Sequence, residues 1–270
     1  MGKVIFFDVD GTLVSFGGQM PESAKEALRK ARNNGHQLVI CSGRSRGQIY
    51  PWLLEVGFDG IVAATGAYVE HGGEVVYRHF MSEDELRIVA ELLEEAEACY
   101  SAQAGERMIT SVRHRDRQIA RFKELADDEM IDQIWKNVEL TDHIWQYEDI
   151  EKLVYYESKI SVPQIRKRLA GICDVTESSF ETAQSDSGEI TCSGINKAHG
   201  MQKYLVHTGK AKKDTVAFGD GPNDFDMLEY AQVGVAMGNA VEELRRRADF
   251  VTKHIDEDGV AYALKELGLI

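Results

Sequence analysis

Residues 4–13 read VIFFDVDGTL, four consecutive apolar side chains followed by two aspartates and a glycine turn. A continuous apolar run is typical of a strand that is buried on both faces of a parallel sheet. Side chains at alternate positions of an extended segment point the same way, so Asp8 and Asp10 are expected on one side. Ligands of open α/β sheets bind at the carboxyl ends of the strands. The segment therefore predicts both a fold and the place of a site.

Strands and helices alternate on both sides of this segment. Further strands are predicted at residues 37–41, 60–64, 215–218, 233–236 and 250–252, with a hairpin around Gly72-Gly73. The helices between and after them are predicted at residues 21–34, 49–56, 196–207, 223–231, from 241 onward, and at 260–267. Strand–helix–strand units with right-handed crossovers build a parallel sheet. The expected fold is an α/β, doubly wound parallel sheet.

The middle of the chain departs from this alternation. Ser82-Glu83-Asp84-Glu85 is a capping box, which predicts the start of a helix. Two strands and a second helix are predicted after it, at residues 108–112, 153–157 and 130–138. Strands with interspersed helices indicate an α+β unit on an antiparallel sheet. We expect an inserted domain at residues 81–188, which divides a core domain into residues 1–80 and 189–270.

Composition excludes several classes of protein. Across 270 residues, 31 Lys and Arg against 45 Asp and Glu give a formal charge of −14. This balance argues against a general nucleic-acid binder, which carries a basic face. The four cysteines lie far apart and have no zinc-site spacing, so free thiols are expected. No signal sequence or membrane span is recognisable, and we expect a cytoplasmic protein.

Three further polar segments follow predicted strands or open predicted helices. Ser42 and Gly43 offer a hydroxyl and backbone N–H groups, which together can hold a phosphoryl oxygen. Lys197 opens a helix, where the helix dipole does not favour a cation, so it needs carboxylate or phosphate partners. Asp220 and Asp224 crowd one glycine-rich turn and repel each other unless a cation is present.

Each segment taken alone also has a structural explanation, as a polar turn, a Ser-Gly turn or a solvated surface lysine. A calcium loop fits poorly, because its glycine is the sixth residue, whereas Gly11 is the fourth residue counted from Asp8. Four such segments in chain order, all at the ends of parallel elements, are not explained in this way. Several carboxylates match a hard cation, and Mg²⁺ is the usual partner of phosphate groups.

In combination, DVDGTL, SGR, Asn196-Lys197 and GDGPND resemble the haloacid dehalogenase (HAD) superfamily of phosphatases, in its Cof-like branch. The resemblance covers essentially the whole chain. It implies a Rossmann-like HAD core with the insert as a mobile cap domain. It also implies Mg²⁺-dependent hydrolysis of small phosphorylated metabolites, such as sugar phosphates or phosphorylated cofactors, through an aspartyl-phosphate intermediate. Ser42 stands where many relatives have Thr, and Ala198 stands where many have Gly.

The same resemblance implies a role for each site residue. Asp8 would be the nucleophile, and Asp10 would be the general acid and base. Mg²⁺ would be held by the carboxylates of Asp8 and Asp220 and the backbone carbonyl of Asp10, with Asp224 supporting it directly or through water. The transferring phosphoryl group would be bound by Val9, Ser42, Gly43, Lys197 and Asn223.

Two other functions remain open. A phosphomutase of the same superfamily would use the same residues and would require a bisphosphorylated activator. A phospho-accepting or phosphate-sensing protein without enzymatic activity also carries acids and a lysine on a parallel sheet, but Asp10 and the insert disfavour it. The expected partner is a small phosphorylated metabolite, with no nucleic acid and no membrane. The expected state is a monomer or a weak homodimer.

Overall fold

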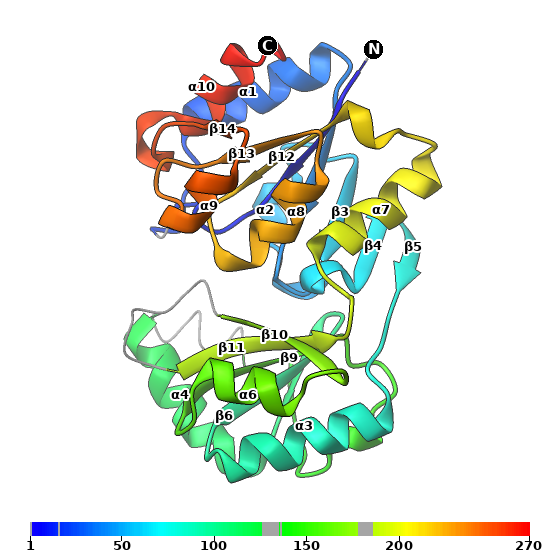
Figure 1. The fold of residues 1–270 in the computed structure, drawn as a ribbon, viewed down its shortest axis with the longest axis vertical. Helices are drawn as coiled ribbons and strands as arrows, with labels where there is room; N and C mark the ends of the chain where they lie inside the picture. The colour runs from blue at the N-terminus through cyan, green and yellow to red at the C-terminus, as the bar shows by residue number, and fades with distance from the viewer. Residues whose placement is uncertain (1, 16, 126–134, 136, 178–185) are drawn as a thin grey trace. The chain divides into compact units, whose positions relative to one another are not determined.

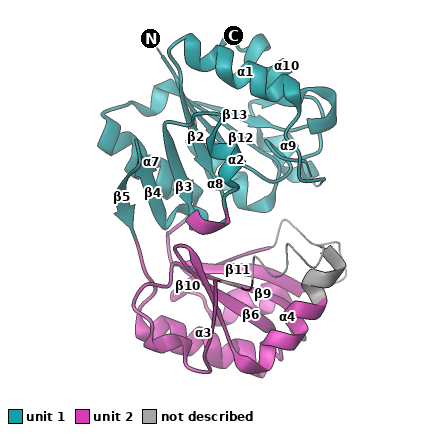
Figure 2. Cartoon of the chain, turned by 180° about the vertical axis from the view of Figure 1, so that it is seen from behind, with its two compact units in different colours: residues 1–44, 49–78, 196–270 teal, residues 45–48, 79–195 magenta. Residues whose placement is uncertain are grey.

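The structure is a computed structural model that describes residues 2–15, 17–125, 135, 137–177 and 186–270 (Figure 1). The chain divides into two compact units (Figure 2). Unit 1 consists of Met1–Arg44, Ile49–Arg78 and Asn196–Ile270, and unit 2 of Ser45–Gln48 and His79–Ile195. Unit 2 spans the expected insert at 81–188 and extends a few residues beyond it at both ends.

Unit 1 is built on an eight-stranded sheet. Its strands are β1 (Val4–Phe7), β2 (Gln37–Cys41), β3 (Gly60–Ala63), β4 (Tyr68–His71), β5 (Glu74–Arg78), β12 (Thr215–Gly219), β13 (Val233–Ala236) and β14 (Phe250–Val251). Their order is β14-β13-β12-β1-β2-β3-β4-β5. The pairs from β14 to β3 are parallel, and β4 and β5 add an antiparallel hairpin. This arrangement confirms the predicted α/β fold with a parallel sheet.

Helices alternate with these strands. They are α1 (Glu22–Asn33), α2 (Pro51–Leu54), α7 (Lys197–Thr208), α8 (Phe225–Tyr230), α9 (Glu242–Arg247) and α10 (Gly259–Glu266). α1 packs against α10, while α7 packs against α8, β3 and β4. The helix predicted at 49–56 is shorter than expected, because Pro51 opens a single turn that ends at Leu54. The helix predicted from residue 223 begins with a 3₁₀ turn, Pro222–Asp224.

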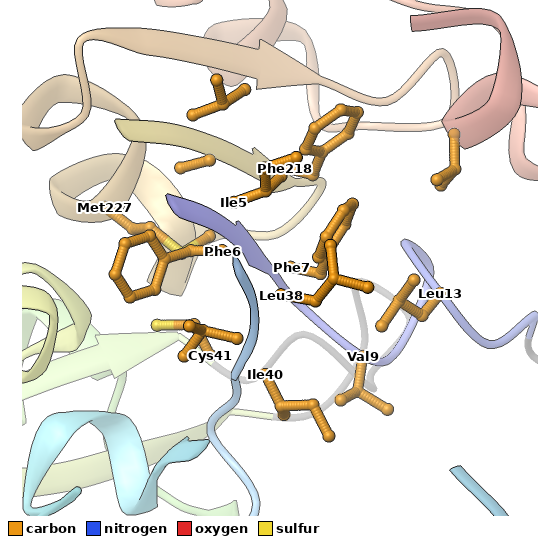
Figure 3. Close-up of a cluster of buried hydrophobic side chains, with 14 of the residues drawn as sticks. Ile5, Phe6, Phe7, Val9, Leu13, Leu38, Ile40, Cys41, Phe218 and Met227 are labelled. Atoms are coloured by element: carbon orange, nitrogen blue, oxygen red, sulfur yellow. The ribbon is translucent and has the colours of Figure 1, made fainter. Parts of the chain in front are cut away.

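β1 lies at the centre of the core. Its four apolar side chains are fully buried, between β2 on one side and β12 on the other. Phe7 stacks on Phe218 of β12, with ring centroids 4.8 Å apart (Figure 3). Phe7 is in register with both Phe218 and Ile40. The residues that follow these three strands therefore begin at the same edge of the sheet.

Unit 2 contains a six-stranded sheet. Its strands are β6 (Cys99–Ala104), β7 (Arg107–Thr110), β8 (Val138–Leu140), β9 (Lys152–Ser158), β10 (Cys173–Glu177) and β11 (Asp186–Cys192), in the order β10-β11-β9-β6-β7-β8. Its helices include α3 (Glu83–Glu95), α4 (Val112–Leu125) and α6 (Val162–Arg168). The predicted capping box starts α3, because Ser82 and Glu85 exchange side-chain and backbone hydrogen bonds.

Three details of unit 2 differ from expectation. The strand predicted at 108–112 ends at Thr110, and Val112 already begins α4. The helix predicted at 130–138 lies mostly outside the described residues, and its last residue, Val138, instead begins β8. β7 and β8 are parallel, whereas an antiparallel sheet was predicted. Parallel neighbours need a long connection that returns the chain to the end at which the first strand began, and α4 lies in this connection. A short hairpin joins only antiparallel strands.

Two expectations concern the whole chain. All four cysteines are buried and unpaired, as expected for free thiols. Among the described residues, no helix has both the length and the apolar character that crossing a membrane requires.

Candidate active site

The predicted site residues of unit 1 follow three neighbouring parallel strands. Asp8 comes directly after β1, Ser42 directly after β2, and Asp220 directly after β12. The backbone N–H of Asp8 donates to the carbonyl oxygen of Phe218 at 2.9 Å, which ties the end of β1 to the end of β12. Strand register therefore brings together side chains that are far apart in the sequence.

Three carboxylates form a cluster at this edge. One carboxylate oxygen from each of Asp8, Asp220 and Asp224 lies within 4.8 Å of the others, and all three residues are buried. Like charges held this closely in a buried place repel each other strongly. A cluster of oxygen ligands without His or Cys suits a hard cation such as Mg²⁺. The donor chemistry of the cluster therefore fits the predicted metal.

Lys197 lies against the same cluster. It is the first residue of α7, its side chain is fully buried, and Nζ lies 2.6 Å from Oδ1 of Asp8 and 2.6 Å from Oδ1 of Asp224. Burial alone would lower the pKa of Lys197, but the charges of Asp224 and Asp8 outweigh this effect and raise the pKa. Lys197 is therefore a cation, and its two carboxylate partners explain why α7 begins with a positive charge.

Charge in the cluster is not balanced by Lys197 alone. Burial raises the pKa of Asp8 well above its ordinary value, Lys197 opposes that rise, and Asp224 and Asp220 add to it. Burial and the charge of Asp224 also raise the pKa of Asp220, to about 7. With all three carboxylates ionised, the one ammonium would leave a formal charge of −2. A divalent cation would balance it.

Asp224 shapes the turn that carries Asp220. Its Oδ2 accepts the backbone N–H groups of Asp220 and Gly221, both at 2.9 Å, while Oδ1 accepts from Lys197. The carboxylate also lies close to Gly219, where an added Cβ would be 2.5 Å from Cγ of Asp224. Oδ2 thus has two donors and Oδ1 has one, so Oδ1 is the oxygen of Asp224 that could support a metal, directly or through water.

The turn after Asp10 is fitted to Asp220. Gly11 has φ +83°, a conformation that favours glycine, and a Cβ there would lie 2.1 Å from Oδ2 of Asp220. The next residue, Thr12, donates from Oγ1 to Oδ1 of Asp220 at 2.8 Å. Gly11 and Thr12 of the DVDGTL segment therefore hold the Asp220 side chain against the end of β1.

Asp10 has a partner that the sequence did not indicate. Nε and Nη2 of Arg44 donate to its two carboxylate oxygens, at 2.6 and 2.8 Å. Nη2 of Arg44 also donates to the hydroxyl of Tyr50 at 2.8 Å, and the guanidinium lies over that ring. Arg44 is the third residue of the SGR segment. Its positive charge is the one feature of the sequence that could have suggested a carboxylate partner, and it does not identify Asp10 as that partner.

Strand register places two of the predicted phosphoryl-binding residues, Val9 and Ser42, at the same level of neighbouring strands. Ser42 and Val9 each come two residues after the register pair formed by Ile40 and Phe7. Ser42 is buried, and its Oγ accepts the backbone N–H of Arg44 at 3.2 Å. Gly43 is buried beside it, and Asn223 is half-buried in the 3₁₀ turn between Asp220 and Asp224. Their roles in binding the phosphoryl group stay predictions.

Comparisons with known proteins agree on one family. The family model for haloacid dehalogenase-like hydrolases matches residues 5–264. The Bacillus subtilis protein named "Putative phosphatase YkrA" is 32% identical over 270 residues, which cover 99% of this chain and 98% of that protein. The "5-amino-6-(5-phospho-D-ribitylamino)uracil phosphatase YitU" of the same organism is 28% identical, with 97% and 96% covered. A solved structure, that of the "HAD Subclass IIB Sugar Phosphatase BT4131", has a TM-score of 0.82 at 28% identity and covers 99% of this chain and 100% of its own.

Proposed function

Because the chain is a phosphatase of the haloacid dehalogenase-like hydrolase family, we propose that it hydrolyses small phosphorylated metabolites with Mg²⁺, through an aspartyl-phosphate formed on Asp8. The family match confirms the resemblance found in the sequence. The observation that carries the proposal is the buried carboxylate of Asp8 at the end of β1. It contacts the ammonium of Lys197, and one of its oxygens lies within 4.8 Å of a carboxylate oxygen of Asp220 and one of Asp224.

The first step would be the attack of an Asp8 oxygen on phosphorus. Oδ1 accepts from Lys197, and Oδ2 is the oxygen that remains for the attack. The new Asp8–phosphorus bond forms as the bond to the leaving oxygen breaks, and Asp10 gives that oxygen a proton. Mg²⁺, held by Asp8, Asp220 and the carbonyl of Asp10, would neutralise phosphate charge and let the carboxylate approach.

In the second step, Asp10 would remove a proton from the water that attacks the aspartyl-phosphate, which releases phosphate and restores Asp8. Both oxygens of Asp10 accept from Arg44 in this structure, so Asp10 would exchange its proton at a lone pair that Arg44 does not occupy. Donors around the cluster would hold the three equatorial phosphoryl oxygens, as such a transition state requires. These donors are Val9, Ser42, Gly43, Lys197 and Asn223.

The proposed substrate is a sugar phosphate or a phosphorylated cofactor. One relative is named for a phosphorylated ribityl compound, and another is described as a sugar phosphatase. Unit 2, in the domain boundaries predicted at 81–188, would act as a cap that selects the substrate. A cytoplasmic location and a monomer or weak homodimer belong to the same proposal. A phosphomutase remains the alternative activity.

A substrate panel tests the proposal. Purified protein is assayed for phosphate release from sugar phosphates, phosphorylated polyols and phosphorylated cofactors, with Mg²⁺ or with EDTA, and the Asp8→Asn variant serves as control. We expect Mg²⁺-dependent release that the variant lacks. Acid-quenched enzyme should also carry one phosphoryl group on the peptide that contains Asp8. Rates equal to those of Asp8→Asn on every substrate would overturn the proposal. Isomeric products that require a bisphosphorylated activator would favour the phosphomutase.

A further inference from the structure

The loop between β13 and α9 forms hydrogen bonds with both segments that carry the proposed metal ligands, the one after β1 and the one after β12. The backbone N–H of Met237 donates to the carbonyl oxygen of Gly219, and that of Val241 donates to the carbonyl oxygen of Asp220, both at 3.0 Å. The loop Met237–Val241 is thus hydrogen-bonded to the backbone of Asp220 and of the residue before it. None of its residues belongs to the acidic cluster.

The side chain of Asn239, in the middle of this loop, contacts the turn that follows Asp10. Its Nδ2 donates to the carbonyl oxygen of Gly11 at 2.8 Å, and its Oδ1 accepts the backbone N–H of Ile255 at 3.0 Å. One partner is an acceptor and the other a donor, so the orientation of the carboxamide is determined. A carboxamide is suited to this place because it offers a donor and an acceptor side by side.

A small movement at Gly11 would disturb two proposed metal ligands. Gly11 follows Asp10, whose backbone carbonyl is one proposed ligand. It also approaches Asp220 so closely that a Cβ would lie 2.1 Å from Oδ2. Thr12, the next residue, donates to the other oxygen of Asp220. A hydrogen bond that fixes Gly11 therefore fixes the spacing between the oxygens of Asp10 and Asp220.

We propose that Asn239 is a positioning residue for the metal site. The loop holds Asp220 through the backbone and Gly11 through the Asn239 carboxamide, so that ligands from β1 and β12 converge on one cation. Asn239 is not itself a proposed ligand, because its carboxamide bonds to the backbone of Gly11 and Ile255. Residues that orient metal ligands in this way typically change metal affinity by 10- to 100-fold when substituted. The inference rests on the proposed Mg²⁺ dependence.

The test compares two near-isosteric substitutions. Asn239→Asp keeps the acceptor for Ile255 but replaces the donor to Gly11 with an oxygen that repels the Gly11 carbonyl. Asn34→Asp is the matched control, because Nδ2 of Asn34 likewise donates to a backbone carbonyl, that of Leu269 at 3.0 Å, and neither residue belongs to the proposed site. For each protein, the melting temperature is measured against Mg²⁺ concentration, which yields an apparent Kd without any assay of activity.

We expect Asn239→Asp to weaken Mg²⁺ binding by about tenfold or more, and Asn34→Asp to leave it unchanged. The added negative charge would by itself attract Mg²⁺, so weaker binding is opposite to the electrostatic effect. Asn239→Ala, which adds no charge, should weaken binding as well. In activity assays the Mg²⁺ concentration for half-maximal rate should rise, while the KM for substrate at saturating Mg²⁺ changes little.

Equal or tighter Mg²⁺ binding by both Asn239 variants would overturn the role of Asn239. Weaker binding by Asn34→Asp to the same extent would also overturn it, because the effect would then reflect general stability. A wild-type protein whose melting temperature does not respond to Mg²⁺ would instead contradict the proposed function.

Discussion

The nucleophile proposed at Asp8 is a buried carboxylate, and burial favours its protonated form. Nζ of Lys197 at 2.6 Å opposes this effect without reversing it, so the pKa of Asp8 stays raised in the metal-free protein. The same ammonium contacts Asp224, so a single lysine links the nucleophile to the turn that carries Asp220. Removing the charge of either acid therefore changes the environment of the other.

The substitution Asp8→Asn should abolish turnover while the fold remains. An amide keeps the shape of the side chain but cannot form the acyl-phosphate, so we expect kcat to fall on the order of 10³-fold or more. The loss of one charge from a repulsive cluster should leave the melting temperature equal or higher. Steady-state kinetics and thermal unfolding check both points. More than a tenth of wild-type activity in a clean preparation would contradict the assignment of Asp8.

The substitution Asp10→Asn should separate substrates by their leaving groups. Mg²⁺ binding should persist, because the proposed ligand at this position is the backbone carbonyl. Protonation of the leaving oxygen is lost, so alkyl phosphates should slow on the order of 10²- to 10⁴-fold and activated aryl phosphates less. The measurement is kcat/KM for a series of phosphate esters of graded leaving-group pKa. Equal losses across the series would show that Asp10 is not the acid.

Among the elements, α7 places its first residue by close packing. Gly200 lies where α7 meets β3, and a Cβ there would be 2.4 Å from Cγ1 of Val62 and 2.9 Å from Cα of Gly66. Gly66 in turn approaches the backbone of Asn196, the residue that caps α7 through its side chain. Two glycines thus let the start of α7 contact the sheet, and Lys197 enters the site from there.

Gly200→Ala should therefore lower both stability and activity. In an open helix the exchange would stabilise by about 1 kcal/mol. Here the added methyl group has to displace α7, so we expect a lower melting temperature and a lower kcat through misplacement of Lys197. The second substitution Val62→Ala removes the nearer of the two contacting atoms and should restore part of both. A stabilised Gly200→Ala enzyme with normal kcat would contradict this account of the packing.

The strands of unit 1 were predictable because buried parallel strands are continuous apolar runs, as in Val4–Phe7 and in Gln37–Cys41 after its first residue. α4 was not, because it begins with Val112, which is 57% exposed, and continues through charged residues with a weak apolar face. An apolar residue at the end of a strand pattern was therefore assigned to the strand. The same weakness of pattern placed Val138 in a helix when it begins β8.

The clustering of acids was predictable from the rule that sites lie at the carboxyl ends of strands, since Asp8 and Asp220 directly follow strands and Asp224 lies in the turn after Asp220. The contact of Lys197 with Asp8 and Asp224 agrees with the argument from the helix dipole. The contacts of Arg44 and Asn239 were not predictable. Asn239 bonds to a backbone carbonyl, and the position of a carbonyl depends on the folded chain and not on the residue type.

At the scale of the whole molecule, the acidic cluster links stability to pH and Mg²⁺. The raised pKa of Asp220, about 7, means that the metal-free native state binds a proton that the unfolded state releases near its ordinary value of 3.8. This contribution to stability is present at low pH and is lost as the pH rises through 7. Mg²⁺ binds the ionised form, so its stabilising effect should increase over the same range.

Melting temperatures between pH 5 and pH 8, with Mg²⁺ or with EDTA, check this expectation. The difference between the two series should widen as the pH rises. Asp220→Asn cannot titrate and lacks a ligand, so it should show a small difference at every pH and a higher melting temperature than wild type in EDTA at pH 8. A difference that is constant with pH in the wild-type protein would contradict the linkage to Asp220.

The central position of β1 has a consequence for synthesis on the ribosome. Val4 pairs with Thr215, so one edge of β1 stays open until β12 has emerged. The described strands of unit 2, by contrast, lie between Cys99 and Cys192, so their sheet can form earlier. In a nascent chain stalled before Thr215, unit 2 should therefore resist proteolysis while unit 1, which lacks β12, remains incompletely folded. Such a chain exposes an apolar strand edge, the kind of surface that chaperones protect.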